Sequence, residues 1–215
     1  MKLRTITLTG LLLILTGFLA CGGDIGVNRD IEVADGEVHE GNITSVNGSI
    51  RIGEASKVEG SCQTVNGSIS VGDGSKVNDL TTVNGSVRIA SDVTVDGDIN
   101  SVNGAVTVQE GTQIGGNVTT VNGNIELSNV KVDRNIVTIN GQIELQQQSV
   151  VKGDVLIKEN KGNTEHRQHI NIRLQGGSIV EGDIIVEDED ADVTVYLSDS
   201  SEVKGQIENA RVEKE

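Results

Sequence analysis

The chain has 215 residues, a formal net charge of −15, 27 Gly, no Pro, no Trp, and a single Phe and a single Tyr. The acidic balance excludes nucleic acid and anionic lipid as electrostatic partners. Because a core without aromatic residues must be built from Val, Ile and Leu, the composition favours thin stacked layers over a large globular centre.

Residues 1–20 have the pattern of an export signal. A short basic start precedes an apolar run from Leu8 to Leu19, which is too short to span a bilayer as a mature helix. Ala20, a small residue, stands directly before Cys21. This stretch resembles bacterial lipoprotein signal peptides, and the resemblance implies that Cys21 becomes the lipidated first residue. Gly22 in place of Asp then implies sorting to the outer membrane. An ordinary secretory signal beside a Cys is the alternative.

The rest of the chain is organised by a phrase of Val or Ile followed by Asn-Gly, which returns at intervals of 18 or 19 residues. Such a fixed period is the signature of a repeat architecture. We expect residues 21–26 to form a lipidated Cys with a Gly-rich tether, and residues 27–215 to form one repeat domain. The phrase contributes Asn47, Asn66, Asn84, Asn103, Asn122 and Asn140, followed by Gly48, Gly67, Gly85, Gly104, Gly123 and Gly141.

Aliphatic residues keep fixed positions around each phrase, as Ile43, Ile50, Ile52 and Val58 do around Asn47. Alternation over a few residues predicts a strand with one buried face, and the variable polar residues between these slots predict exposed corners. Three short strands and three bends per unit would make one turn of an all-β, single-stranded parallel β-solenoid, a β-helix that buries its aliphatic residues between turns. We expect it to be right-handed, because the six-residue spacing of left-handed hexapeptide helices is missing.

The same register extends from Asn28 to Asp192 and predicts nine turns. An antiparallel meander is the competing interpretation, because Asn-Gly is also the strongest short hairpin signal. No second turn signal of comparable constancy accompanies the phrase, which argues against the meander.

The solenoid gives the phrase a structural cause. Identical Asn side chains stacked at one corner can form a hydrogen-bonded ladder along the rod, and the Gly beside each Asn permits a positive φ at the bend. Cys62 occupies an aliphatic slot, so we expect it to be a buried free thiol.

Two polar segments interrupt the register, and we expect both to be solvated. The first is a corner loop over residues 158–169, which contains His166 and places His169 in the Asn slot. Two His residues without a fixed third ligand are weak evidence for a metal. The second is the acidic run 187–192, which lacks the spacing of known calcium motifs. The sequence therefore predicts no metal and no cofactor.

The repeat units resemble two bacterial β-solenoid groups, the polymer-forming bactofilin-like scaffolds and the adhesin-type solenoid domains of lipoproteins. The resemblance covers Val27 to about Val212 and implies a non-catalytic, lipid-anchored envelope scaffold or adhesin-like interaction protein. Its implied partners are the membrane, further copies of the chain joined end to end, and an envelope protein or polysaccharide.

The alternative function is a β-helix that binds carbohydrate or cleaves polysaccharide as a lyase or glycosidase. Arg51, Arg88 and Arg134 are scattered along the units, and the sequence shows neither an aromatic platform nor a Ser-His-Asp or Cys-His pattern. We therefore expect the protein not to be an enzyme.

Overall fold

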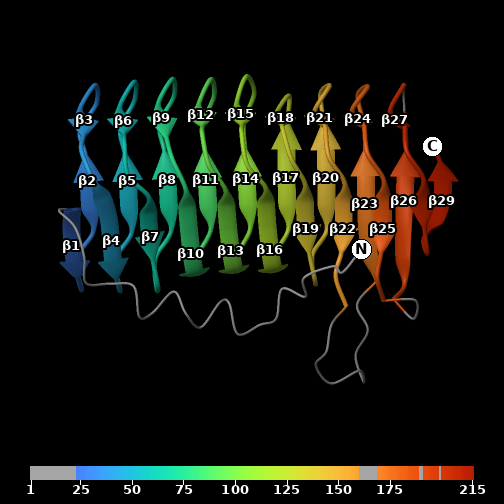
Figure 1. Ribbon diagram of the computed structural model, residues 1–215, viewed down its shortest axis with the longest axis horizontal. Coiled ribbons are helices and arrows are strands. Elements are labelled where there is room, and N and C mark those ends of the chain that lie inside the picture. The colour runs from blue at the N-terminus through green and yellow to red at the C-terminus, as the bar shows by residue number, and fades with distance from the viewer. Residues whose placement is uncertain (1–22, 160–168, 189–190, 199) are drawn as a thin grey trace, which may run out of the picture.

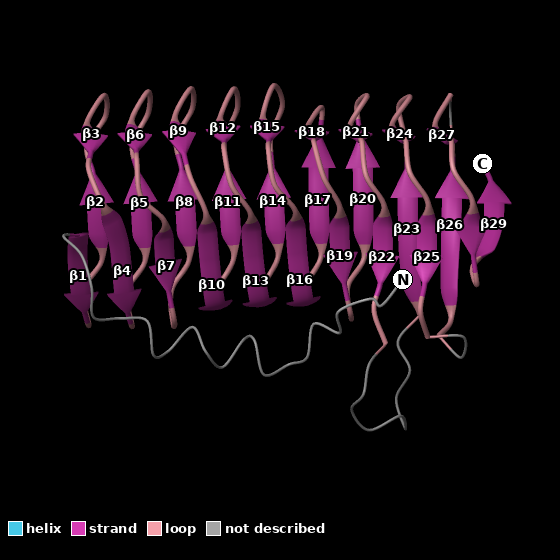
Figure 2. Ribbon diagram, viewed as in Figure 1, coloured by secondary structure: helices cyan, strands magenta, loops and turns pink. Residues whose placement is uncertain are grey.

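The computed structural model describes residues 23–159, 169–188, 191–198 and 200–215. Every regular element within these ranges is a strand, so they contain no helix of the length and apolarity that a membrane span requires (Figure 2). The chain winds along one axis from β1 to β29 and forms a rod with three faces (Figure 1).

Sheet A has ten strands: β1 (Gly23–Val27), β4 (Asn42–Val46), β7 (Cys62–Thr64), β10 (Leu80–Asn84), β13 (Ile99–Asn103), β16 (Val118–Asn122), β19 (Ile136–Thr138), β22 (Val155–Ile157), β25 (Ile184–Val186) and β28 (Ile207–Glu208). Sheet B also has ten: β2 (Ile31–Val33), β5 (Ile50–Ile52), β8 (Ile69–Val71), β11 (Val87–Ile89), β14 (Val106–Val108), β17 (Ile125–Ser128), β20 (Ile143–Gln146), β23 (Ile170–Leu174), β26 (Val193–Leu197) and β29 (Arg211–Lys214). Sheet C has nine: β3 (Val38–His39), β6 (Lys57–Val58), β9 (Lys76–Val77), β12 (Thr94–Val95), β15 (Gln113–Ile114), β18 (Lys131–Val132), β21 (Val150–Val151), β24 (Ile179–Val180) and β27 (Glu202–Val203).

Each strand pairs in parallel with the equivalent strand of the turn before and the turn after. Leu80 of β10, for example, lies opposite Cys62 of β7 and Ile99 of β13. The structure is thus a parallel β-solenoid of nine complete turns, as the sequence predicts, with β28 and β29 beginning a tenth. Because the paired strands are parallel, the meander interpretation is wrong.

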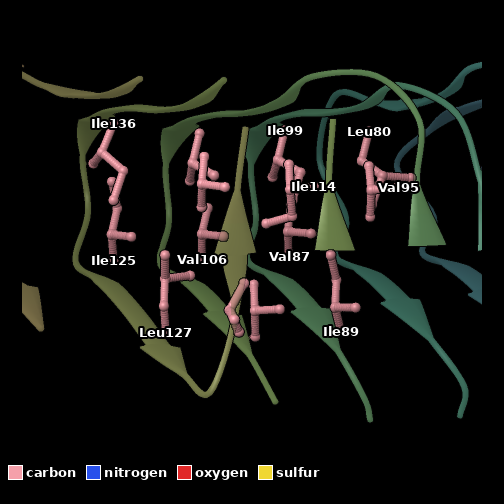
Figure 3. Packing of buried hydrophobic residues seen from close by; sticks show 14 of the residues in the cluster. Leu80, Val87, Ile89, Val95, Ile99, Val106, Ile114, Ile125, Leu127 and Ile136 are labelled. Atoms are coloured by element: carbon pink, nitrogen blue, oxygen red, sulfur yellow. The ribbon is translucent and has the colours of Figure 1, made fainter. Parts of the chain in front are cut away.

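The core is a narrow column of aliphatic side chains enclosed by the three sheets. Leu80, Val87 and Val95 are buried from sheets A, B and C of one turn, and their equivalents in the next turn are Ile99, Val106 and Ile114. Figure 3 shows these residues pointing inward and stacked turn upon turn. Each turn therefore buries its apolar surface mainly against its two neighbours, so a single turn has no core of its own.

One feature of the fold differs from the expectations above, and a second concerns the Val of each phrase. Gly23–Val27 is strand β1 and pairs with β4. Residues 23–26, which we expected to be part of a tether, therefore belong to the solenoid. The Val of each phrase points outward: in β4, Ile43 and Ser45 are buried, whereas Thr44 and Val46 are half-buried on the outside. The period of two along a strand forces this outcome, because Ile43 and Val46 are three residues apart.

Both insertions fall in the chain between a strand of sheet A and a strand of sheet B. One separates β22 from β23, and the other separates β25 from β26. Residues 160–168, which include His166, and residues 189–190 lie outside the described residues. The flanking strands keep their register across both insertions, with Ile143 opposite Ile172 and Ile172 opposite Val195.

Candidate functional site

The Asn side chains of the repeated phrase stand in one row at the corner between sheets A and B. The Nδ2 group of each donates a hydrogen bond to Oδ1 of the Asn one turn earlier, and the row also includes Asn28. The bonds are Asn47 to Asn28 at 2.9 Å, Asn66 to Asn47 at 2.7 Å, Asn84 to Asn66 at 2.8 Å, Asn103 to Asn84 at 2.9 Å, Asn122 to Asn103 at 3.1 Å and Asn140 to Asn122 at 3.0 Å. This row, which we call the Asn ladder, locks successive turns together at one corner.

Different chemistry occupies the same corner beyond Asn140. His169 and Asp192 take the next two places, and Nδ1 of His169 lies 2.8 Å from Oδ2 of Asp192. The guanidinium of Arg211 pairs with the other carboxylate oxygen of Asp192. The hydrogen bond from His169 and the charge of Arg211 hold the pKa of Asp192 below its usual value of 3.8. An ionic network thus replaces the amide ladder in the last turns.

The Gly that follows each ladder Asn is required because the neighbouring turn leaves no room for a side chain. None of Gly48, Gly67, Gly85, Gly104, Gly123 and Gly141 has a positive φ, so the conformational reason given above is wrong. A Cβ atom on Gly104 would lie 2.1 Å from the carbonyl oxygen of Gly85, and the other five would meet a backbone oxygen at 2.0–2.1 Å. Adjacent turns approach so closely at this corner that a side chain cannot fit between them.

Hydroxyl groups explain why Ser or Thr precedes the Val of the phrase. Oγ1 of Thr64 donates to the carbonyl oxygen of Gly48 at 2.8 Å, and Oγ1 of Thr82 donates to that of Gly67 at 2.8 Å. These hydroxyls point into the rod and satisfy carbonyl groups that the corner would otherwise leave without a partner.

The two cysteines of the chain have different positions. Cys21 lies outside the described residues. Cys62 is fully buried and unpaired in β7, where it stacks between Ile43 and Leu80. Burial raises the pKa of the Cys62 thiol to about 12. This thiol is a small apolar side chain of the core and has no nucleophilic character at neutral pH.

A second polar row, which the sequence analysis missed, runs along the corner between sheets C and A. In most turns an Asp or Asn oxygen accepts a hydrogen bond from the backbone N–H of the equivalent residue one turn later. The donor and acceptor pairs are Asp98 to Asp79 at 2.9 Å, Asn117 to Asp98 at 2.6 Å, Asn135 to Asn117 at 3.2 Å, Asp154 to Asn135 at 2.8 Å and Asp183 to Asp154 at 2.9 Å. The sequence signal for this row is the Asp or Asn that directly precedes the first buried aliphatic residue of sheet A in most units. Because either residue supplies the oxygen, the position looked variable.

The outer face of sheet A is uncharged over most of its length. Two columns of side chains point outward, and from β1 to β19 neither contains a charged residue. One column is Ile25, Thr44, Gln63, Thr81, Asn100, Thr119 and Val137; the other is Val27, Val46, Val65, Val83, Val102, Val121 and Ile139. The first column continues through Leu156 and Ile185. We call this surface the aliphatic face.

The outer face of sheet B carries charge and a shallow hollow of about 210 Å³. Glu126, Glu144 and Arg173 line it and lie opposite one another on adjacent strands. The guanidinium carbon of Arg173 is 5.1 Å from the ring centroid of Tyr196, on the next strand. Oδ1 of Asn171, also in the lining, is buried and has no hydrogen-bond partner among the described residues.

The described part of the chain contains no cluster of three or more His, Cys, Asp or Glu residues that could hold a metal ion. In the acidic run, Glu187 pairs with Lys158, and Asp192 pairs with His169 and Arg211. These carboxylates are used in contacts between turns.

Comparisons of the chain with protein-family models, with curated proteins and with solved structures give no match. Function must therefore be argued from the surface of this molecule.

Proposed function

We propose that the protein is a non-catalytic, lipid-anchored scaffold or adhesin-like interaction protein of the bacterial cell envelope, attached to the outer membrane. The observation that carries the proposal is the aliphatic face, because an acidic chain with a net charge of −15 has no reason to leave one face of a rod uncharged unless another surface covers it.

The construction of the rod supports a scaffold. Hydrogen-bonded rows at two corners and a continuous core hold each turn in register with the next. With turns about 4.8 Å apart, ten strands of sheet A extend over roughly 43 Å. Such a rod presents its faces at fixed distances from one end.

The position of Cys21 supports the anchor. Only Gly22 separates it from β1, which begins at Gly23. A lipid on Cys21 would therefore hold the first turn of the solenoid at the membrane surface, without a long flexible linker. The aliphatic face would then begin at the membrane and extend away from it along the rod.

Metabolic labelling with an alkyne fatty acid in a Gram-negative host tests the anchor. We expect label and outer-membrane fractionation for the wild-type chain and for Cys62→Ser, and loss of both for Cys21→Ser. Cys62→Ser is the matched control, because its thiol is buried in the core and inaccessible to acylation. Labelling that survives in Cys21→Ser would contradict the anchor.

A carbohydrate-binding β-helix is the second candidate, and the hollow on sheet B favours it. Paired carboxylates, a guanidinium and a tyrosine ring on neighbouring strands can bond sugar hydroxyls and stack on a sugar ring. Titration of the purified chain with envelope polysaccharide tests this candidate. Binding that Tyr196→Ala abolishes and Tyr196→Phe retains would support it, and the absence of binding by the wild-type chain would remove it.

A further inference from the structure

The aliphatic face sets strict demands on whatever covers it. From β1 to β19 it offers no charge to a charged partner, and its outward residues are mostly Val, Ile and Thr, with Gln63 and Asn100. A matching surface must be flat, uncharged and about 30 Å long, since seven strands lie about 4.8 Å apart. The side chains of the matching surface must also recur about every 4.8 Å if they are to fit between the side chains of successive strands of sheet A.

We infer that this surface is the aliphatic face of a second copy of the same chain, and that the two rods lie side by side and point in the same direction. The inference rests on the proposed function, because it names the partner of the face that carries that proposal. Two copies with a net charge of −15 repel each other, and sheet A is the face whose two outward columns bring no formal charge against their counterparts from β1 to β19. The two faces share one repeat distance, so their side chains interdigitate as in stacked sheets.

The corners decide the relative direction of the rods. The Asn ladder runs along one edge of the aliphatic face, and the row that contains Asp79, Asp98, Asp154 and Asp183 runs along the other. When the rods are parallel, a two-fold axis along the rods sets the Asn edge of one copy against the Asp edge of the other. When they are antiparallel, Asp faces Asp, and like charges oppose each other. The parallel arrangement also leaves both chains with Cys21 at the same end, where one membrane can hold both.

The area indicates a weak pair that depends on local concentration. A strip about 30 Å long and about 10 Å wide covers roughly 300 Å² on each copy, which is below the size of standard specific interfaces. Confinement of both chains to one membrane raises their effective concentration and compensates for weak affinity.

Cysteine cross-linking in cells that express the full chain tests the inference. Asn100→Cys places a thiol on the aliphatic face at the fifth strand of sheet A, Thr44→Cys places one on its second strand, and Thr107→Cys places a control thiol on the outside of sheet B. A short bis-maleimide reagent is added to intact cells. The wild-type chain reports the background, since the thiol of Cys62 is buried.

We expect Asn100→Cys and Thr44→Cys to give a cross-linked dimer at about ten times the yield of Thr107→Cys or more, as expected for thiols held within reach of each other. Adding Val102→Lys to Asn100→Cys should reduce the yield to the control level, with an unchanged melting temperature showing that the fold survives. A dimer from Asn100→Cys without one from Thr44→Cys would overturn the parallel arrangement, because antiparallel rods would hold the two Thr44→Cys thiols about 29 Å apart.

The remaining outcomes separate this inference from the proposed function. A cross-link from Asn100→Cys to a different protein would overturn the inference that the partner is a second copy. The proposal that this face is an interaction surface would then still hold. No cross-link above that of Thr107→Cys would overturn the inference. Maleimide labelling of Val102→Cys in intact cells then decides whether the face is covered at all.

Discussion

The side-chain amide of Asn103 donates a 2.9 Å hydrogen bond to the side-chain oxygen of Asn84, one turn earlier, and accepts a 3.1 Å bond from Asn122, one turn later. Each ladder Asn from Asn47 to Asn122 thus links its own turn to both neighbouring turns through a side chain that is exposed to water. This arrangement makes the ladder open to a direct stability test.

Asn103→Ala should lower the free energy of unfolding by about 1 kcal/mol, because two amide hydrogen bonds are lost and water replaces them only in part. Asn100→Ala is the matched control, since Asn100 lies on the same strand, β13, and its side chain makes no hydrogen bond among the described residues. Urea unfolding measures both. Equal losses in the two variants would show that the ladder does not contribute to stability.

Gly104→Ala should cost about 3 kcal/mol, because the added Cβ would collide with the backbone of the preceding turn. The atom would stand 2.1 Å from the carbonyl oxygen of Gly85. Gly74→Asn is the control: Gly74 has a φ of 66° and open space around its Cα, and Asn tolerates this conformation. Thermal unfolding of both variants should show a large loss for Gly104→Ala alone, and a tolerated Gly104→Ala would refute the close approach of the turns.

The Cys62 thiol should not react with a disulfide reagent at pH 8 until the protein unfolds. Burial raises the pKa of this thiol to about 12, so almost none of it is thiolate at that pH. The thiol of the native protein should react far more slowly than the thiol of the protein unfolded in urea, at about 6–8 M. Rapid native reaction would mean that the turns around β7 open freely.

The ionic corner predicts a pH dependence. The hydrogen bond from His169 is the main cause that lowers the pKa of Asp192 below 3.8. The ionised carboxylate therefore contributes stability above pH 3.8, and this contribution is lost as the pH falls through the lower pKa of the folded state. A carbon NMR titration should show the pKa of Asp192 rising toward 3.8 in His169→Gln. A pKa that does not change would mean that this hydrogen bond does not form in solution.

The fold could be predicted from the sequence because a repeat multiplies every local signal. Ile50 and Ile52 follow Asn47 at a spacing that, in a single unit, is weak evidence for a strand. The same spacing recurs in every unit, and this recurrence makes it strong evidence for a solenoid. Counting register positions also gave the nine complete turns. The tenth corner, at Asn209, escaped the count because the last unit is shortened and its apolar residue Val212 is exposed.

The surface was harder to predict than the core. Val46 and its equivalents look like core residues because they are aliphatic and recur in every unit, yet the pleat of sheet A turns them outward. Composition alone does not distinguish a Val that points into the core from one that points outward. The structure separates these cases and thereby exposes the aliphatic face.

The reason for the glycine column was also beyond the sequence. Asn-Gly is a familiar sign of a positive φ, and Asn47 itself has a φ of 59°. The Gly beside it is needed because two backbones meet there. That reason depends on the distance between turns, which no local pattern contains.

Thiol footprinting in intact cells tests most directly whether the aliphatic face is covered. Val102→Cys places a thiol in that face on β13, and Thr107→Cys places one on the outside of sheet B on β14. We predict that a maleimide labels Val102→Cys about ten times more slowly than Thr107→Cys in cells, and that the two rates converge for the purified chain at dilutions that separate weak complexes. Equal labelling rates in cells would show that the face is open to solvent and would contradict the proposed function.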